Sequence, residues 1–166
     1  MTHTTELDLT GLYTAHRLPL VRMVVLLVDD IGTAEDVVQE AFAALHQNRY
    51  RLRDPDAALG YLRATAVNNA RSVLRKRQTA RRHLRLARQE SAEPADSELL
   101  LAAAHQQVLA AVRQLPPRQR EVLALRYWAN LSEAEIAQAL SISRGAVKSN
   151  ASRGLDKLES ILGDMR

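Results

Sequence analysis

The sequence LPPRQREVLALRYWANLSEAEIAQALSISRGAVKSNASRGLDKLESIL, residues Leu115–Leu162, contains two helix patterns separated by a short break. In the first pattern, Ser132 is followed three residues later by Glu135, which is the S-x-x-E signature of a helix N-terminus. Apolar residues then recur at three- and four-residue spacing as far as Leu140. The pattern predicts a short helix with one buried face.

A second helix is expected directly after the serines of the SIS break, whose hydroxyls can bond nearby backbone groups and so favour turns and caps. Ser143 is well placed to cap it. The positions expected to face the core are Ala146, Val147, Leu155, Leu158 and Ile161. The other side carries Arg144, Lys148, Ser149, Asn150 and Arg153. Two short helices across a tight turn predict a DNA-binding helix-turn-helix, and a helical hairpin with a solvated polar face is the alternative.

The composition favours an all-α chain. The 166 residues suffice for one ordinary domain or two small ones, and only six are glycine and five proline. There is no cysteine, which excludes disulfides, thiolate metal sites and cysteine nucleophiles. The longest apolar run, Met23–Val28, is too short to span a bilayer, and no signal peptide precedes it. We therefore expect a cytoplasmic protein without membrane insertion.

The N-terminal part predicts two helical pieces, Leu9–Arg17 and Leu20–Val28, around Pro19. Thr33 is expected to cap the next helix, Ala34–Gln47. Its buried face is expected to consist of Ala34, Val37, Val38, Ala41 and Leu45. The opposite face carries Asp36, Gln39, Glu40 and Ala43. Such an acidic face is either plain solvated surface or the docking face for a basic partner helix.

A basic loop, Asn48–Asp56, leads into a long helix that Asp54 caps and Pro55 begins. Its expected core stripe consists of Leu62, Ala66, Ala70, Val73 and Leu74. A second stripe consists of Tyr61, Thr65, Asn68, Ser72 and Arg75. An aromatic ring, amides, hydroxyls and a cation in one line suit unstacked bases, although a half-buried tyrosine beside an unoccupied polar face would read the same.

The strongest charge block is RKRQTARRHLRLAR, which begins at Arg75 and has no acidic residue. Its cations are Arg75, Lys76, Arg77, Arg81, Arg82, Arg85 and Arg88. The block predicts contacts with nucleic-acid phosphates, because a merely solubilising helix end would normally mix charges of both signs. The following polar, acidic residues 89–97 are predicted to be a linker.

Two further helices are expected in the second half, Leu99–Leu115 and Arg118–Trp128. The core candidates of the latter are Val122, Leu123, Leu125 and Trp128. The chain is thus predicted to form two small helical domains, residues 1–88 and 98–166, joined by the linker.

No catalytic constellation is present in the sequence. The five histidines are scattered without metal-ligand spacing, and no phosphate-binding, dinucleotide-binding or nucleophile-elbow motif occurs. We therefore expect no enzymatic activity, no metal, no cofactor and no small-molecule substrate.

These motifs together resemble a known family. LPPRQREVLALRY, LSEAEIAQALSISRGAVKS and SRGLDKL resemble region 4 of bacterial sigma factors. TAEDVVQEAFAAL resembles their region 2.2, and YLRATAVNNARSVLRKR resembles regions 2.3 and 2.4. The match covers nearly the whole chain in the expected order. With two domains, a short linker and no region 1.1 or region 3 domain, the chain is similar to the extracytoplasmic-function group of the sigma-70 family.

The resemblance implies a subunit that binds core RNA polymerase and directs promoter-specific initiation. Docking on the polymerase clamp helices would use Asp36, Gln39 and Glu40. Contacts with the −10 element would come from Tyr61, Asn68, Ser72, Arg75, Lys76 and Arg77, and the loop 48–56 would receive a flipped base. The −35 element would be read by Arg144, Lys148, Ser149, Asn150 and Arg153 while this domain rests on the polymerase flap. An anti-sigma factor is a further expected partner.

Three positions depart from the family pattern. Tyr61 replaces the usual tryptophan and preserves stacking, and Ser72 stands where aspartate is common. Asn150 stands where arginine is common, and since asparagine pairs with adenine whereas arginine pairs with guanine, the preferred −35 sequence is expected to differ. The alternative function is a helix-turn-helix regulator that does not join polymerase; a protein that only binds acidic partners is a weaker rival.

Overall fold

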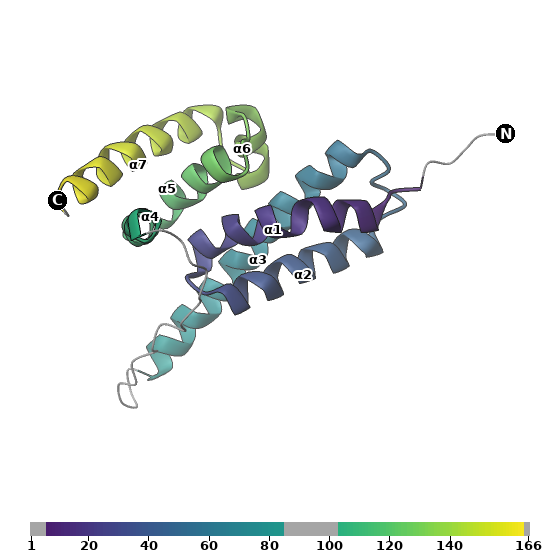
Figure 1. Ribbon diagram of the computed structural model, residues 1–166, viewed down its shortest axis with the longest axis horizontal. Helices are drawn as coiled ribbons and strands as arrows, with labels where there is room; N and C mark the ends of the chain where they lie inside the picture. Colours follow the sequence, from purple (N-terminus) through teal and green to yellow (C-terminus); the bar gives the residue numbers. More distant parts are fainter. Residues whose placement is uncertain (1–5, 85–102, 165–166) are drawn as a thin grey trace.

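The computed structural model describes residues 6–84 and 103–164, and every regular element in these two ranges is a helix (Figure 1). The all-α prediction is therefore confirmed. In order the elements are α1 (Leu9–Val28), α2 (Ile31–Gln47), α3 (Pro55–Leu84), α4 (Ala103–Arg113), α5 (Pro117–Leu123), the π-helical turn η1 (Ala124–Trp128), α6 (Glu133–Leu140) and α7 (Arg144–Asp164). The predicted linker, residues 89–97, and residues 99–102 of a predicted helix lie outside the described ranges.

The prediction of two helical pieces around Pro19 is wrong, because α1 is one helix that passes through this proline. Pro19 is exposed, so its ring does not enter the core, and the burial of the apolar side chains that follow it stabilises the second half of the helix. The helix ends at Asp29, whose backbone is left-handed (φ 70°) and whose N–H bonds to the carbonyl of Val25.

By length and composition alone, α1 as a whole is apolar enough to cross a membrane, which the short run Met23–Val28 did not suggest. The apolar side chains of its second half lie inside the protein. Buried along its second half are Leu20, Val21, Met23, Val24, Leu26, Leu27 and Val28. Helices that pack in the core of a protein can be as long and as apolar as α1.

The predicted cap of α2 is also wrong: Asp30, three residues before Thr33, caps this helix. Asp30 has an extended backbone, and its carboxylate accepts a bond of 2.8 Å from the backbone N–H of Thr33. Thr33 itself is inside the first turn of the helix, which begins at Ile31. The expected buried face of α2 is confirmed, and Phe42 joins it.

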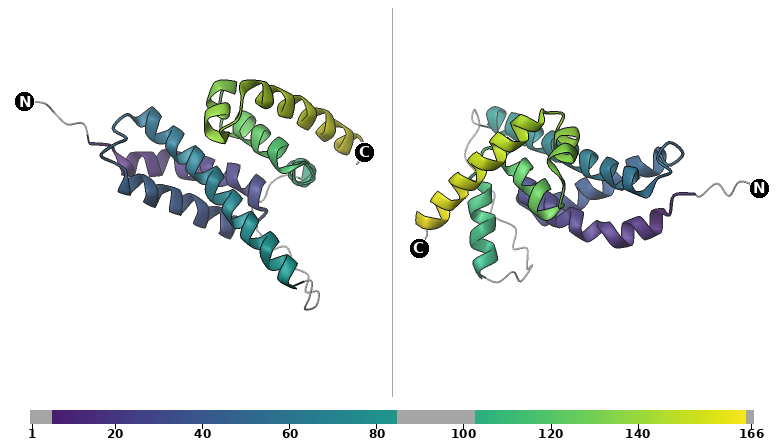
Figure 2. Two further views of the ribbon diagram at one scale, coloured as in Figure 1. Left: turned by 180° about the vertical axis from the view of Figure 1, so that it is seen from behind. Right: turned by 90° about the horizontal axis from the view of Figure 1, so that it is seen from above.

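The long helix α3 begins as predicted, with Pro55 as its first residue and the Asp54 carboxylate accepting from the N–H of Asp56. Helices α1, α2 and α3 lie side by side, and the C-terminal end of α3 projects beyond the other two (Figures 1 and 2). From the predicted core stripe, Leu62, Ala66 and Ala70 are buried, whereas the remaining two positions are half-buried because they approach the projecting end.

The second half packs α5 and α6 against α7 around a core that includes Val122, Leu123, Leu125, Ile136 and Val147. Two predicted core residues in this half lie elsewhere. Trp128 is 36% exposed and Leu155 is 41% exposed.

Local backbone geometry explains both differences. In η1 the N–H of Ala129 bonds to the carbonyl of Ala124, five residues back, and this wider turn rotates Trp128 away from the core. On α7 the buried positions are Val147, Ala151 and Gly154. Leu155 follows Gly154 by one residue, about 100° further round the helix, on the side that faces solvent.

The predicted helix-turn-helix geometry is confirmed in detail. Ser132 and Glu135 form a reciprocal capping box at the start of α6, with bonds of 3.2 and 2.7 Å. The turn between the helices passes through Ser141 in a left-handed conformation (φ 53°). Ser143 accepts a bond of 3.1 Å from the N–H of Ala146 and thereby caps α7.

The two halves lie against each other (Figures 1 and 2). Helix α6 packs on α3, and η1, α4 and α5 pack on α1. The first half thus contributes α1 and α3 to the contact, and the helix-turn-helix half contributes its first four elements.

Candidate nucleic-acid and polymerase interfaces

The predicted docking face lies on α2. Asp36, Gln39 and Glu40 are all exposed, on the side of the helix opposite its buried residues. Among residues 6–84 and 103–164, none of the three takes part in an ion pair. The face is therefore open to a partner, and its two carboxylates favour a basic one.

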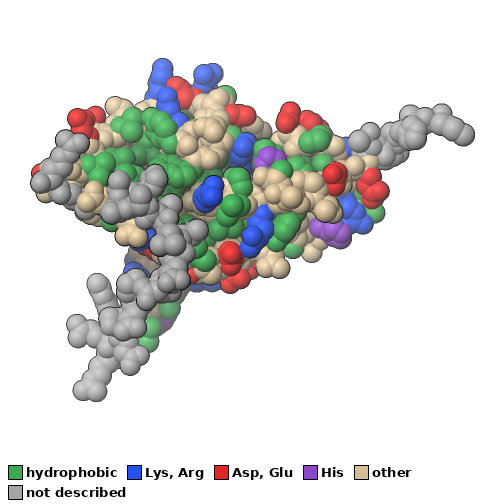
Figure 3. Space-filling model, in the orientation of Figure 1, with side chains coloured by type: hydrophobic (Ala, Val, Ile, Leu, Met, Phe, Trp, Pro, Cys, Tyr) green, Lys and Arg blue, Asp and Glu red, His purple; other side chains and the backbone are tan. Residues whose placement is uncertain are grey.

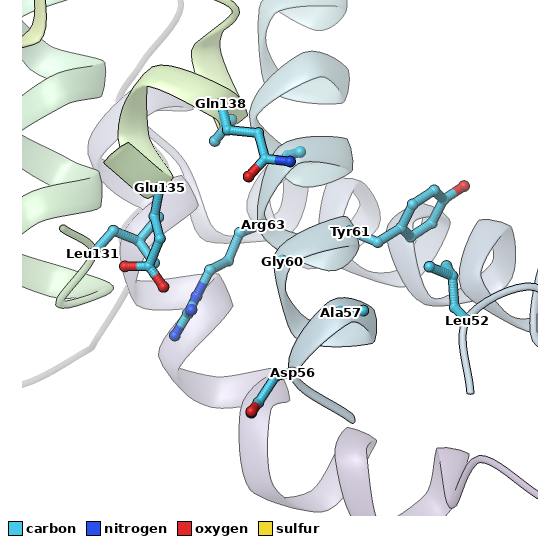
Figure 4. A pocket seen from close by; sticks show the side chains of 11 residues that line it. Leu52, Asp56, Ala57, Gly60, Tyr61, Arg63, Leu131, Glu135 and Gln138 are labelled. Atoms are coloured by element: carbon cyan, nitrogen blue, oxygen red, sulfur yellow. The ribbon is translucent and has the colours of Figure 1, made fainter. Parts of the chain in front are cut away.

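The predicted base-binding stripe on α3 is ordered by the loop before it. The Asn48 amide donates to the Tyr61 hydroxyl (3.2 Å) and to the carbonyl of Ala44 (2.9 Å), which ties Tyr61 to the end of α2. Tyr61 is half-buried, and its ring lies on the same side of α3 as Leu52 (Figure 4). Asn68, two turns along α3, is exposed. The stripe therefore presents a fixed aromatic ring at one end and a free amide further along.

A second aromatic group near this stripe was not singled out from the sequence. Tyr50, in the loop between α2 and α3, is 66% exposed. The guanidinium of Arg49 lies 4.4 Å from the centre of the Tyr50 ring and donates to the carbonyl of His46 at 2.9 Å. An exposed ring held beside a cation suits stacking on a base next to a phosphate. The basic character of the loop was the available signal.

Most of the described cations at the end of α3 are exposed, whereas Arg77 is bound within the protein. Arg75, Lys76, Arg81 and Arg82 are exposed on the projecting part of the helix. Arg85 and Arg88 lie outside the described residues. On the face shown in Figure 3, cationic and acidic side chains are interspersed. The last turn of α3 carries Arg81, Arg82 and His83 without an acidic residue.

The inclusion of Arg77 among the DNA contacts requires correction, because its guanidinium is bound within the protein. It donates to the carbonyl of Val28 (2.9 Å), the Asp30 carboxylate (2.9 Å) and the Thr33 hydroxyl (2.6 Å). Burial raises the pKa of the Asp30 carboxyl, but hydrogen bonds from Thr33 and Arg77 outweigh this effect and hold that pKa below its usual value. Arg77 therefore joins α3 to the corner between α1 and α2.

On α7, Arg144, Lys148 and Arg153 are exposed as predicted, and Ser149 is half-buried. Asn150 differs from these residues. It is half-buried beside the core face, and its amide nitrogen donates to the carbonyl of Ala146 at 2.8 Å. Its amide oxygen accepts no hydrogen bond from the described residues and can accept one from a base edge.

An ion pair between the two halves was not foreseen from the sequence. Arg71 on α3 donates two hydrogen bonds to the Glu121 carboxylate on α5, at 2.6 and 2.7 Å. Arg118 donates a third, at 3.0 Å. Hydrogen bonding to Glu121 raises the pKa of the Arg71 guanidinium against the opposing effect of burial. Glu121 is only 7% exposed, so it is a buried acid with two cationic partners.

An apolar surface accompanies these charged sites. Half-buried hydrophobic residues gather between α4 and α7 in Figure 3. They are Val108, Leu109, Leu158 and Ile161. Among the described residues, no three histidine or acidic side chains lie close enough together to hold a metal ion. Taken together, the helix-turn-helix and the exposed cations on α3 and α7 are typical of a helical DNA-binding protein.

Comparison with known proteins identifies the family. Residues 12–81 match Sigma-70 region 2, and residues 105–158 match Sigma-70, region 4. The RNA polymerase sigma-E factor of Streptomyces antibioticus is 33% identical over 141 residues, 82% of this chain and 74% of that relative. The chain therefore belongs to the sigma-70 family, in its extracytoplasmic-function (ECF) group, and it is an RNA polymerase sigma factor.

Two more comparisons agree with this assignment. The ECF RNA polymerase sigma factor SigX of Bacillus subtilis is 29% identical over 154 residues, 89% of this chain and 79% of that relative. The sigma factor RpoE from Bartonella quintana, solved in complex with the anti-sigma factor NepR, has the same fold with a TM-score of 0.74. At 22% identity the alignment covers 96% of this chain and 99% of that one.

Proposed function

We propose that this sigma factor recruits core RNA polymerase through α2 and directs it to promoters by reading the −10 element with α3 and the −35 element with α7. The observation that carries the proposal is the presence, on one small chain, of two helix faces suited to DNA and of an acidic face that forms no ion pair with the described residues. A regulator that acted alone would have no use for the third surface.

Docking is assigned to Asp36, Gln39 and Glu40. Their exposure and their lack of ion-pair partners among the described residues support this role, because a basic helix of the clamp could form charge-assisted hydrogen bonds with the two carboxylates. The half-buried apolar surface between α4 and α7 supports a second protein contact, with the polymerase flap.

Promoter opening is assigned to the α3 stripe. Tyr61 would stack on a base that leaves the duplex, Asn68 and Ser72 would bond base edges, and Arg75 and Lys76 would hold phosphates. The anchoring of the Tyr61 hydroxyl by Asn48 supports this role, since a stacking platform must be rigid before the base arrives. The neighbouring pair of Arg49 and Tyr50 extends the same surface toward a flipped base.

Reading of the −35 element is assigned to Arg144, Lys148, Ser149, Asn150 and Arg153. The exposed cations suit phosphates and guanine, and the free amide oxygen of Asn150 suits a donor on a base edge. Each half contacts few phosphates and would bind DNA weakly by itself. Mounting both halves on polymerase makes the second contact effectively intramolecular, which raises the affinity of the whole assembly for promoters that carry both elements.

The proposal includes the organisation and setting of the chain. Residues 1–88 would form the region 2 domain, residues 98–166 the region 4 domain, and residues 89–97 the linker between them. The protein would act in the cytoplasm as a specificity subunit rather than as a catalyst. The Bartonella quintana neighbour was solved with an anti-sigma factor, and we include such an inhibitor among the partners of this chain.

The experiment that tests the proposal mixes the chain with core RNA polymerase on a sizing column and then assays initiation on promoter DNA. Comigration with promoter-dependent initiation is expected. DNA binding without comigration would instead indicate a regulator that does not join polymerase.

The docking face is tested by the double variant Asp36→Arg with Glu40→Arg, which should abolish comigration while leaving the helical content unchanged. The control is Glu6→Arg with Asp56→Arg, which makes the same charge change on exposed residues outside the surfaces assigned to polymerase. Unchanged affinity for core in the α2 variant would remove this face from the proposal.

A further inference from the structure

The contact between the two halves contains two arginine–carboxylate ion pairs and a third arginine that lies near a carboxylate. Arg71 and Glu121 form the closest one, with two parallel hydrogen bonds. Arg113 of α4 pairs with Asp29 at the end of α1, at 2.9 Å. Arg63 of α3 faces the Glu135 carboxylate of α6 (Figure 4).

Beside these charges, the contact between the halves is incompletely filled. A cleft of about 440 Å³ separates α3 from α6, and a second cleft of about 140 Å³ lies between α1 and η1. Trp128 borders the smaller cleft and keeps a third of its surface exposed. Relative motion of two domains is the default expectation unless their interface is large and hydrophobic. Two ion pairs and these incompletely filled clefts lie in the contact, and we call the observed arrangement of the two halves the closed state.

Arg71 occupies a particular place in this closed state. On α3 it lies three residues after Asn68 and four residues before Arg75, so all three side chains are neighbours on the helix surface. It thus adjoins the stripe assigned to the −10 element, on the side that faces the helix-turn-helix half. A guanidinium binds a phosphate with the same two-pronged geometry that it uses for a carboxylate.

We propose that Arg71 is a further promoter-contacting residue, that Glu121 masks it in the closed chain, and that DNA phosphate replaces this carboxylate when the two halves separate. The proposal rests on the function assigned above to the α3 stripe. Separation does not leave Glu121 without a partner, because Arg118 on the same helix α5 continues to donate to it at 3.0 Å. Arg71 therefore passes from the Glu121 carboxylate to a DNA phosphate, while Glu121 keeps one cationic partner in the second half.

The test uses the full chain in four forms: wild type, Glu121→Gln, Glu121→Gln with Arg71→Gln, and Glu35→Gln as the matched control. Glu35 is an exposed acid that pairs with Arg17 within the first half, so its variant makes the same charge change without touching the contact. The chain has no cysteine, and spin labels can therefore be placed through His46→Cys on α2 and Glu159→Cys on α7, both exposed. Double electron–electron resonance then measures the distance between the two spin labels, one in each half.

DNA binding is measured in parallel by fluorescence anisotropy with a mixed-sequence single strand of about 20 nucleotides, over a series of salt concentrations. Glu121→Gln should lengthen the distance between labels and tighten DNA binding several-fold relative to Glu35→Gln. Adding Arg71→Gln should remove that gain and reduce the slope of log affinity against log salt by about 0.7, the value for one phosphate contact on single strands.

A second variant protects the test against a folding defect in Glu121→Gln. Arg71→Lys keeps the charge but loses the two-pronged geometry, so it should also lengthen the distance and tighten DNA binding, by a smaller factor. The inference is overturned if neither variant changes the distance, or if the gain in DNA affinity survives the loss of Arg71. Because the wild-type initiation assay is independent of these variants, failure here with normal initiation would leave the proposed function intact.

Discussion

Arg77 offers a direct test of whether a cation in a basic block serves the fold or the DNA. In Arg77→Gln, three hydrogen bonds from one guanidinium are lost, to Val28, Asp30 and Thr33. A hydrogen bond from a charged group contributes about 1.5–3 kcal/mol when it is buried. Here the Arg77 and Asp30 side chains are 39% and 32% exposed, so water replaces part of what is lost. We therefore expect the free energy of unfolding to fall by about 2 kcal/mol in total.

The assay is urea unfolding followed by circular dichroism, with Lys76→Gln as the control. Lys76 is the preceding residue, carries the same charge, is exposed and makes no hydrogen bond to the described residues. Its variant should keep the wild-type unfolding free energy within about 0.5 kcal/mol, but should bind DNA more weakly because a phosphate contact is gone. The urea midpoint of Arg77→Gln should fall without a change in slope. Equal stability of the two variants would show that the three bonds of Arg77 contribute nothing, and the assignment of Arg77 to the fold would be wrong.

Three further predictions address promoter recognition and pH. Asn150→Ala should relax the preference at one −35 base pair by about 1–3 kcal/mol. If a library of −35 sequences shows the same order of affinity for the Asn150→Ala protein and the wild type, Asn150 does not read the −35 element. The double variant Tyr61→Ala with Asn68→Ala should slow abortive initiation on duplex promoters, and a mismatched −10 bubble should restore part of the rate because flipping is easiest from an unpaired strand; an equal deficit on both templates would argue against a role in melting. Hydrogen bonds within the capping box lower the pKa of the Glu135 carboxyl. The stability that this carboxylate adds is therefore complete above its ordinary pKa of 4.5, and it is lost as the pH falls through the lower pKa of the folded protein. Glu135→Gln should therefore flatten the acid side of a profile of melting temperature against pH. Parallel profiles for the variant and the wild type would contradict this reasoning.

The helices and their ends were predictable where the signal is local. The capping box at Ser132 and the cap at Ser143 involve groups three residues apart, and both form as expected. The start of α3 at Pro55 follows from the fixed backbone of proline. The cap of α2 was misplaced because Asp30 and Thr33 are both good capping residues, and the end of α1 at Asp29 determines which one is used.

The candidate site was predicted less completely than the fold. The exposure of the α2 acids and of the α7 cations follows from helical periodicity, which the sequence displays. The orientation of a single side chain within a polar face does not follow, as the backbone bond of the Asn150 amide illustrates. Trp128 was expected in the core because it is large and apolar. The π-helical turn η1, which no sequence pattern predicts, rotates it outward.

The sequence by itself determined the all-helical class, the helix-turn-helix and the family, because periodicity, capping and motif order are properties of neighbouring residues. Only the tertiary structure decided which arginines remain free for DNA. Arg77 meets Asp30 across 47 residues and Arg71 meets Glu121 across 50, and these distances are closed by the packing of helices rather than by any local rule. The sequence does not distinguish an arginine that binds a carboxylate of the same chain from an arginine that is free to bind phosphate. The partner of each arginine depends on which surfaces come together in the folded chain.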